Sequence, residues 1–211
     1  MAIIDISRML SPRTAVWPGD TPFALTPSLE RRRGHSVNLT SLALSAHTGT
    51  HVDAPRHFSD GGPAVAELGL RPFWGRAQVV SVSKPAGPIY PADLTGYDLG
   101  RARRLLVRSA ASGWDPGRFP AAFVYPSLEL AAHLGRAGII LYGSDTPSMD
   151  AEDSKTLEGH RALERQGIAI LEWLDLSAAE DGVYELAALP LKIEAGDGSP
   201  VRAALRGLRA E

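Results

Sequence analysis

Residues 37–57 read VNLTSLALSAHTGTHVDAPRH, and this stretch holds three of the six histidines in the 211-residue chain. Its first part, residues 37–46, alternates between two faces, which is the period of a half-buried strand. Its second part, residues 47–57, gathers the three imidazoles and a carboxylate around a glycine and a proline. The pattern therefore predicts a strand that leads into a cluster of ionisable side chains.

The spacing within this cluster favours a metal site. A fully extended strand would hold His47 and His51 about 13 Å apart, too far to share a cation bound at about 2 Å. A tight turn at the glycine between them removes that separation, because glycine adopts turn conformations freely. Beyond the turn, His51, Asp53 and Pro55 share one face of an extended segment, and Pro55 stops a helix from continuing. We therefore expect His47, His51 and Asp53 to be ligands and His57 to be a free base, the alternative being histidines clustered by chance.

Two residues far along the chain are candidates to complete the site. Glu172 shares a strand face with Ile168 and Ile170, and a carboxylate on an apolar face needs a partner. A metal would supply one; a strand-end glutamate that reaches solvent or an arginine is the alternative. His160 lies in an expected helix over residues 153–166, and a helix-turn-strand unit would bring it to the same pocket as Glu172. Taken alone, such a histidine is more often a surface or core residue.

The rest of the chain reads as many short strands with two helices. Strands are expected at residues 2–6, 77–82, 104–107, 121–125, 138–142, 168–176 and 183–192, each bounded by turn residues. A short helix is expected to begin at Ser127 and stop at Gly135, and the longer one covers residues 153–166. This order permits one α/β domain over residues 1–211, a length that is ample for a sizeable core.

Composition excludes several classes of protein. The hydrophobic fraction of 44% and charged fraction of 22% are ordinary for a globular domain. The net charge of −2 and a single basic run, Arg31 to Arg33, argue against a nucleic-acid partner. Because there is no cysteine, nitrogen and oxygen must hold any metal. Without a basic leader or an apolar run of about 18 residues, we expect a cytoplasmic protein and no membrane partner.

These residues resemble the cyclase-like metal-dependent hydrolases, whose hallmark is His-x-Gly-x-His-x-Asp-x-Pro-x-His; residues 47–57 match every named position. Within that family the chain is similar to the bacterial kynurenine formamidases (arylformamidases). The similar stretches span nearly the whole chain: WPGDTPF at 17–23, SKTL at 154–157, ILE at 170–172 and SPVRA at 199–203. The resemblance implies a cyclase-like fold of the swivelling β/β/α type, with a mixed, strand-rich, barrel-like sheet and a few outer helices. It also implies a homodimer.

The resemblance implies a centre of two zinc ions per subunit. His47 and His51 are implied to bind one zinc, and His160 to bind the second. Asp53 and Glu172 are implied to be carboxylates that both ions share. Nitrogen and oxygen sites also accept manganese, cobalt or iron, so the residues alone leave the identity of the metal open.

The reaction implied by the resemblance is hydrolysis of N-formyl-L-kynurenine to formate and L-kynurenine by a metal-activated water. His57 is implied to transfer the proton to the departing aryl amine. Trp17 is implied to line the substrate site, although a loop tryptophan is a core anchor about as often as a binding wall. Trp173 departs from the pattern, because a small residue, usually glycine, follows the glutamate in the formamidases. Its bulk is expected to reshape the pocket wall.

Two other functions stay open at this point. A related hydrolase that opens another amide, lactam or lactone, such as the isatin ring, would share the metal centre, and a comparison of substrates would separate the two. A non-catalytic zinc-stabilised binding protein would close the coordination sphere and unfold on chelation. Structural zinc sites usually recruit cysteine, which is absent here, and His57 is spare, so an enzyme is favoured.

Overall fold

The computed structural model describes residues 2–208, and within that range neither of the two helices has the length and apolar character that crossing a bilayer requires. The expected domain over residues 1–211 includes residues 1 and 209–211, which lie outside the described range. The strands are β1 (Ile3–Asp5), β2 (Ala24–Leu29), β3 (Leu39–Ala43), β4 (His51–Asp53), β5 (Trp74–Ser81), β6 (Gly87–Ile89), β7 (Arg104–Arg108), β8 (Val124–Pro126), β9 (Leu141–Ser144), β10 (Ala169–Glu172), β11 (Gly182–Ala187), β12 (Gly198–Pro200) and β13 (Ala204–Gly207). The helices are α1 (Leu128–Arg136) and α2 (Glu158–Arg165).

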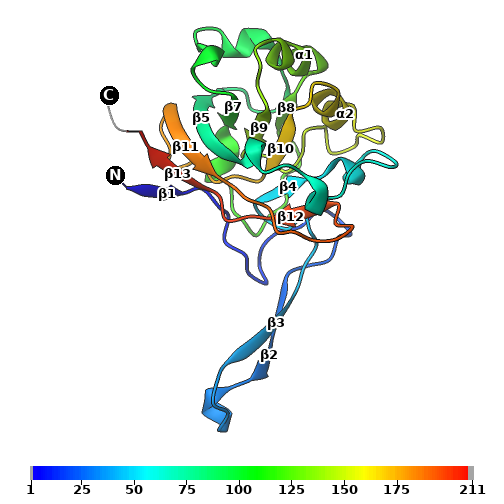
Figure 1. Ribbon diagram of the computed structural model, residues 1–211, viewed down its shortest axis with the longest axis vertical. Coiled ribbons are helices and arrows are strands. Elements are labelled where there is room, and N and C mark those ends of the chain that lie inside the picture. The colour runs from blue at the N-terminus through cyan, green and yellow to red at the C-terminus, as the bar shows by residue number, and fades with distance from the viewer. Residues whose placement is uncertain (1, 209–211) are drawn as a thin grey trace.

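Nine of the strands form one mixed sheet in the order β1-β13-β11-β5-β7-β9-β10-β4-β12. The central strands β5, β7, β9 and β10 are parallel, and the strands on either side are antiparallel. The sheet curls, because Ser7, just past the edge strand β1, forms a bridge with Leu174, just past β10 (Figure 1). A curled, strand-rich mixed sheet with two helices confirms the expected fold class.

The two faces of the sheet bury two separate apolar clusters. On β7, Leu105 packs into the cluster that includes α1 and α2, whereas Leu106 packs into the cluster inside the curl. On β10, Ile170 faces the helices and Leu171 faces the inside of the curl. Because side chains alternate along a strand, Glu172 falls on the helix-covered face beside Ile170.

The helix boundaries differ from those expected in two places. Ser127 does cap α1, since its Oγ accepts a hydrogen bond of 3.0 Å from the backbone N–H three residues later. The helix continues through Gly135, so the expected stop there was wrong; Gly138, with φ of +76°, turns the chain instead. The helix expected over residues 153–166 is shorter than expected and consists of α2 alone, because the residues before it form turns and Leu157 has φ of +50°. A left-handed residue cannot continue a helix.

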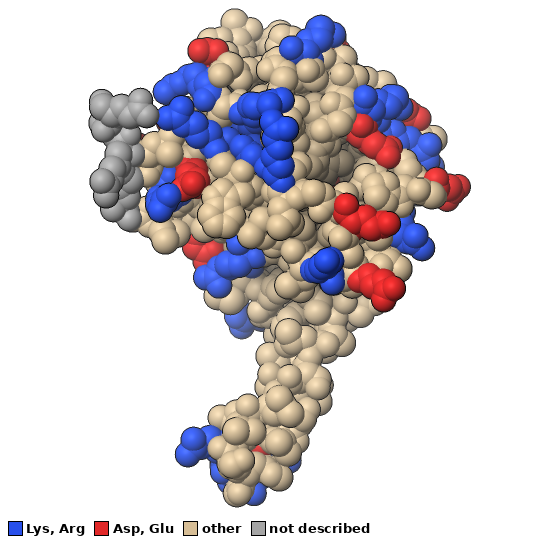
Figure 2. Space-filling view, viewed as in Figure 1, with Lys and Arg blue, Asp and Glu red and all other residues tan. Residues whose placement is uncertain are grey.

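β2 and β3 form a separate hairpin, residues 24–43, which projects from the curled sheet and is called the arm below (Figure 1). The expected strand is present, but all five residues of β3 are exposed, so the expectation that it is half-buried was wrong. No other layer covers either face of the arm among the described residues. Its apolar side chains Leu25, Leu39 and Leu42 are 49%, 53% and 59% exposed. Figure 2 shows an uncharged shaft, with basic side chains gathered at its tip.

Candidate metal centre

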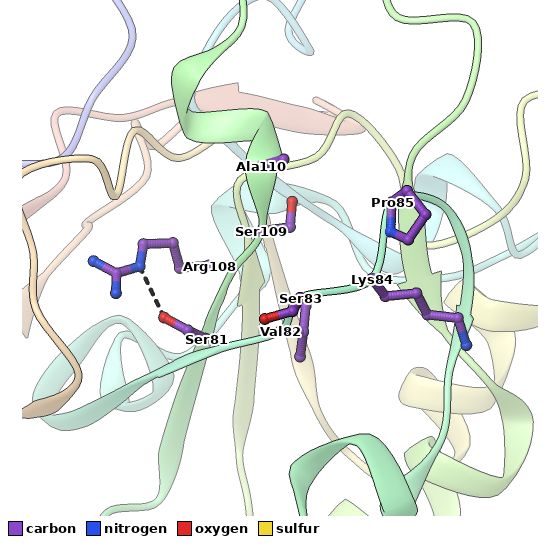
Figure 3. Close-up of a pocket in the computed structure, with 8 residues that line it drawn as sticks. All are labelled: Ser81, Val82, Ser83, Lys84, Pro85, Arg108, Ser109 and Ala110. Atoms are coloured by element: carbon purple, nitrogen blue, oxygen red, sulfur yellow. Dashed lines mark hydrogen bonds between the residues drawn. The ribbon is translucent and has the colours of Figure 1, made fainter.

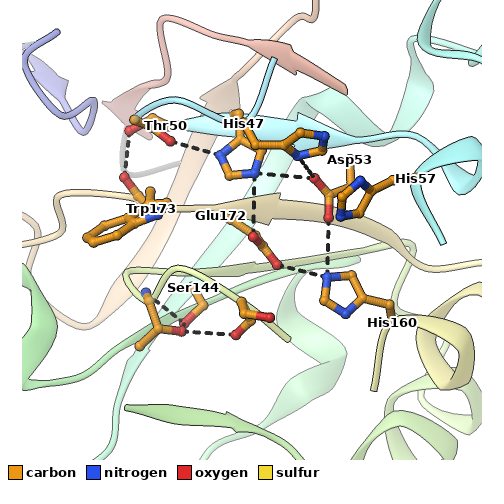
Figure 4. Close-up of polar contacts among 12 residues, drawn as sticks. His47, Thr50, Asp53, His57, Ser144, His160, Glu172 and Trp173 are labelled. Carbon is orange, nitrogen blue, oxygen red and sulfur yellow. Dashed lines mark hydrogen bonds and ion pairs between the residues drawn. The ribbon is translucent and has the colours of Figure 1, made fainter. Parts of the chain in front are cut away.

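Three neighbouring elements carry the ionisable cluster. β4 and β10 are antiparallel, and their register pairs His51 with Glu172 and Asp53 with Ile170. These paired positions share a face of the sheet, so His51, Asp53 and Glu172 all lie on the helix-covered side. Helix α2 packs against β10 and supplies His160 to the same place (Figure 4).

Two turns bring the remaining histidines of the motif to this cluster. Gly49, between His47 and His51, has φ of +66°, which confirms the expected glycine turn. A Cβ at this position would also lie 2.5 Å from Leu10 Cδ2. Pro55, which the sequence analysis expects to stop a helix, begins a short 3-10 turn that ends at His57. Proline suits the first position of such a turn, because its φ is already fixed there.

The two carboxylates each face histidines with both of their oxygens. Asp53 Oδ1 lies 2.9 Å from His47 Nδ1 and 3.3 Å from His51 Nε2, while Oδ2 lies 3.3 Å from His160 Nε2. Glu172 Oε2 lies 3.4 Å from His51 Nε2, and Oε1 lies 3.3 Å from His160 Nε2. The structure thus brings together all five residues that the sequence analysis expects to be ligands.

The donor set fits a metal ion. Asp53 Oδ2 and Glu172 Oε1 are buried and have no hydrogen-bond partner among the described residues. Buried charged oxygens in that state are costly, and a cation would satisfy both. Two triplets place one donor atom per residue within 4.8 Å of one another: His51, Asp53 and Glu172, and His47, Asp53 and His57. Imidazole nitrogen and carboxylate oxygen are ligands for zinc and its first-row neighbours.

Without a cation, protons balance the negative charge of this cluster. Burial opposes a charge on His47, but the carboxylates of Asp197 and Asp53 outweigh burial and raise its pKa to about 10. Burial also opposes a charge on His51, but the carboxylates of Asp53 and Glu172 outweigh burial and raise its pKa to about 9. The pKa of His160 is also raised well above its usual value, and the pKa of Asp53 is held well below its own, in each case despite burial. A metal ion that binds here must therefore displace protons.

His57 lies at the open side of the cluster. Its side chain is 32% exposed, compared with 17% for His47. Its ring centroid lies 4.1 Å from that of His47 and 6.2 Å from that of His160. Burial lowers the pKa of His57, so its ring is neutral near pH 7. Since His57 also belongs to one of the triplets that could hold a metal, its assignment as a free base stays a prediction.

Two acidic residues join the site although the sequence analysis did not single them out. Asp150 Oδ2 lies 2.6 Å from His160 Nδ1, and Asp197 Oδ2 lies 3.1 Å from His47 Nε2. Neither belongs to the histidine motif. For Asp197 the one available signal is the run AGDGSP at 195–200, where two glycines flank a carboxylate and suggest a close approach of backbone to another group.

A row of aromatic rings adjoins the cluster. The ring centroids of Trp17 and Phe119 are 5.1 Å apart, and those of Phe119 and Trp173 are 6.1 Å apart. Trp17 is 37% exposed, whereas Trp173 is buried under the guanidinium of Arg8, 4.7 Å from its ring. Trp173, at the buried end of the row, directly follows Glu172 in the chain, and a substrate-binding role for Trp17 stays a prediction.

The backbone at Trp173 suits the glycine that the resemblance implies at this position. Its φ is +55°, in the left-handed region that favours glycine. Hydrogen bonds hold this conformation: Trp173 N donates to Thr146 O at 3.0 Å, and Thr50 Oγ1 donates to Trp173 O at 2.6 Å. The expected departure from the family pattern is therefore accommodated by packing around the ring, while the backbone keeps a shape made for glycine.

Away from the ionisable cluster, a surface pocket lies at the ends of the parallel strands β5 and β7 (Figure 3). Its basic residues are already engaged, since Arg108 Nε donates to Ser81 Oγ at 2.9 Å and Lys84 Nζ donates to Pro88 O at 2.5 Å. The described lining, residues 81–85 and 108–110, contains neither histidine nor carboxylate. This pocket is therefore no candidate for the metal centre.

Solved structures with a similar architecture include cyclase-like hydrolases. Isatin hydrolase A from Labrenzia aggregata is 25% identical, with a TM-score of 0.81 over 97% of this chain and 93% of that one. A Bacillus stearothermophilus protein described as a predicted metal-dependent hydrolase is 23% identical, with a TM-score of 0.82 over 97% of each chain. At 23% identity, the similarity to the Bacillus stearothermophilus protein shows the fold alone.

Sequence relatives are closer. A protein from Bacillus cytotoxicus named kynurenine formamidase is 41% identical over 205 residues, 97% of each chain. One of the same name from Salinibacter ruber is 45% identical over 207 residues, 98% of each chain. The family model named Cyclase matches residues 4–151, which include the whole histidine motif. With a family match over more than half of its length and relatives above 40% identity, the chain belongs to the Cyclase family.

Proposed function

We propose that this chain hydrolyses N-formyl-L-kynurenine to L-kynurenine and formate. The observation that carries the proposal is the convergence of three histidines on two buried carboxylates, Asp53 and Glu172. The full-length relatives at 41% and 45% identity are named for this activity, which supports the choice of substrate.

The centre would hold two zinc ions per subunit. His47 and His51 would bind one ion together with Asp53 Oδ1 and Glu172 Oε2, and His160 would bind the other with the two remaining oxygens. The way the carboxylate oxygens divide between His51 and His160 supports this assignment. A bound divalent cation supplies two effects here, a lower pKa for a water molecule and polarisation of the formyl carbonyl.

His57 would carry the proton between the two halves of the reaction. A neutral imidazole can accept a proton from the attacking water, whose oxygen joins the formyl carbon. The same ring can then donate that proton to the aryl nitrogen as the carbon–nitrogen bond breaks, which releases the amine and formate. The lowered pKa of His57, caused by burial, and its position on the open side of the cluster both support the role.

The aromatic row would bind the ring of the substrate. Trp17 presents a partly exposed indole, and Phe119 links it to Trp173 beside Glu172. Flat apolar faces suit an aromatic amine, and such pairs add about 0.5–1.5 kcal/mol beyond the area that they bury.

Metal analysis coupled to a turnover assay tests the proposal. The metal-free protein should stay folded and inactive toward N-formyl-L-kynurenine, and about two equivalents of zinc should restore turnover. Full activity without metal would contradict the proposed centre. Unfolding on chelation, with no turnover at any zinc content, would indicate a structural metal instead.

Hydrolysis of a lactam such as isatin is the second candidate, favoured by the similar fold of isatin hydrolase A and by the tryptophan at position 173. Parallel assays with N-formyl-L-kynurenine, a simple aryl formamide and isatin would separate the two. We expect kcat/KM to be highest for N-formyl-L-kynurenine; a clear preference for isatin would overturn the choice of substrate.

A homodimer in the cytoplasm completes the proposal. Leu25 and Leu42 on the arm are exposed, and Leu42 also lines a groove at the base of the arm with Met9 and Leu191. Apolar surface of this extent favours burial against a partner, and a second copy offers a matching arm and groove. In sedimentation experiments, Leu42→Lys should shift the protein toward monomer, whereas Leu128→Lys, which replaces a 51% exposed leucine on α1, should not.

A further inference from the structure

Each of the three histidines expected to bind metal offers its second ring nitrogen to an acceptor of the protein. The pairs are His51 Nδ1 with Gly49 O at 2.8 Å, His160 Nδ1 with Asp150 Oδ2 at 2.6 Å, and His47 Nε2 with Asp197 Oδ2 at 3.1 Å. In every case the other nitrogen of the ring faces the carboxylates Asp53 or Glu172.

This arrangement decides which nitrogen is free to bind. A neutral imidazole carries a hydrogen on one ring nitrogen and a lone pair on the other, and the hydrogen stays on the nitrogen that has an acceptor. An acceptor behind the ring therefore fixes both its orientation and its tautomer. His47 Nδ1 and His160 Nε2 face the carboxylates that a cation would occupy. With a cation bound there, the hydrogen would belong on Nε2 of His47 and on Nδ1 of His160, where Asp197 and Asp150 accept it, and a lone pair of each ring would face the cluster.

We propose that Asp150 and Asp197 are positioning residues, each of which holds one histidine, His160 and His47 respectively, with the correct nitrogen toward the metal. The inference rests on the proposed metal centre and assigns these two carboxylates roles outside the ligand set.

Asp150 couples the orientation of His160 to the start of α2. It is buried, and its Oδ1 accepts a hydrogen bond of 2.7 Å from Gly159 N while Oδ2 accepts one of 3.1 Å from His160 N. The same Oδ2 holds the ring at Nδ1. Gly159 is required for this contact, because a Cβ there would lie 2.0 Å from Met149 O.

Asp197 owes its position to β12. The register of β12 and β4 sets Gly198 opposite Asp53, so Asp197 stands at the edge of the cluster. A Cβ on Gly198 would lie 2.8 Å from His47 Cε1, which shows that the backbone of β12 packs directly on the ring. Asp197 Oδ2 also lies 3.5 Å from His57 Nδ1, so one half-exposed carboxylate lies between a ligand and the proposed base.

The side from which Asp197 approaches argues against its being a ligand itself. It contacts Nε2 of His47, whereas Asp53 contacts Nδ1 on the other edge of the same ring. The oxygens without partners, on Asp53 and Glu172, face His160 and not Asp197. The geometry therefore suits an acceptor behind the ligand.

Zinc affinity measured by competition with a chromophoric chelator tests the inference. Asp197→Ala should weaken the site that contains His47 about tenfold to a hundredfold, and Asp197→Asn should restore most of that loss, because its amide oxygen still accepts from the ring. Asp197 is half exposed, so these variants should fold, and circular dichroism checks this. Asp115→Ala, which removes an exposed carboxylate that accepts from Gly117 N, is the matched control and should leave both affinities within about twofold.

A double-mutant cycle identifies the histidine on which each carboxylate acts. Asp197→Ala should cause no further loss of zinc affinity in a His47→Ala background but its full loss in a His160→Ala background. Asp150→Ala should behave in the opposite way.

Three results would overturn the inference. The first is an Asp197→Ala variant that leaves both zinc affinities within about twofold, and the second is an equal effect of Asp197→Ala in both histidine backgrounds. The third is an Asp197→Ala variant that loses zinc as completely as His47→Ala does, with no recovery in Asp197→Asn. Asp197 would then be a ligand. A wild-type protein that binds no zinc would instead refute the proposed function, and the inference with it.

Discussion

His57 differs from the other histidines of the cluster in its exposure and in its pKa, which burial lowers. We predict that His57→Ala keeps its zinc and loses about 10²-fold to 10⁴-fold in kcat, the usual contribution of a general acid–base. Metal analysis and steady-state kinetics on the same preparation check this. Small loss of turnover would reassign His57 to substrate contact, and loss of zinc would make it a ligand.

Trp173 combines a left-handed backbone with a large buried ring. Trp173→Gly should relieve about 1–2 kcal/mol of backbone strain but lose about 3–5 kcal/mol of packing, so the free energy of unfolding should fall. Trp173→Ala loses the same packing and keeps the strain, and should therefore be less stable than Trp173→Gly by about 1 kcal/mol. Urea denaturation of the three proteins measures this order. An alanine variant as stable as the glycine variant would show that the backbone is unstrained.

Residue patterns in the sequence predicted that the five side chains of the cluster lie together. They did not predict that Asp150 and Asp197 contact two of the histidines from behind. His47, His51 and Asp53 are neighbours in the chain, so their spacing already limits where they can lie. Asp150 and Asp197 reach the cluster only through the start of α2 and the register of β12, which are tertiary features. For Asp150 the sequence offers no signal for such a contact, and for Asp197 it offers only the two flanking glycines.

Helix α2 begins so close to the preceding segment that its second residue must be glycine. We predict that Gly159→Ala, whose Cβ would lie 2.0 Å from Met149 O, destabilises the protein by about 1–3 kcal/mol, the usual cost of overpacking. It should also weaken zinc binding at His160, because the Asp150 contact depends on the same turn. Thermal unfolding and zinc competition measure the two effects.

The matched control for this helix is Gly113→Ala, where an added Cβ has no atom within 4 Å among the described residues. It should leave both measurements unchanged. If Gly159→Ala behaved like this control, the close approach of α2 to Met149 would not be required.

At the scale of elements, periodicity located most strands and failed where burial depended on the rest of the fold. The alternation of residues 37–46 indicated a strand correctly but could not show that the arm leaves the sheet. The strand expected over residues 183–192 ends at Ala187, ahead of Pro190, because proline cannot donate to a ladder. β12 is only three residues long and includes a glycine and a proline, so no pattern could indicate it.

For the whole molecule, the raised histidine pKa values predict how the stability of the metal-free protein depends on pH. His47 and His51 have folded pKa values of about 10 and about 9, above the unfolded value of 6.5. Their contribution is fully present below pH 6.5 and is lost as the pH rises through 9 to 10. Asp53 acts in the opposite sense, because its lowered pKa gives stability that is lost as the pH falls below 3.8, the usual pKa of an aspartate. The melting temperature of the metal-free protein should therefore decline toward pH 10.

Zinc should remove much of that alkaline decline, because the cation replaces the protons that balance the carboxylates. Zinc binding near pH 7 should accordingly release protons, which calorimetry in buffers of different ionisation enthalpy measures. A metal-free protein with constant melting temperature from pH 6 to pH 10, or zinc binding with no proton release, would contradict the charge state described for the cluster.

The architecture of the whole molecule was predictable in class and not in arrangement. Many short strands with two helices permitted an α/β domain, the resemblance implied a mixed sheet, and the observed sheet is mixed. The strand order could not be predicted, since β4, β10 and β12 become neighbours only through pairing between distant segments. That pairing is what assembles the metal centre.

Anomalous diffraction at the zinc edge from crystals of the zinc-loaded protein tests the central claim most directly. The account predicts two peaks, both adjoining Asp53 and Glu172, one on the side of His51 and one on the side of His160. A single peak, or zinc bound away from these two carboxylates, would contradict it.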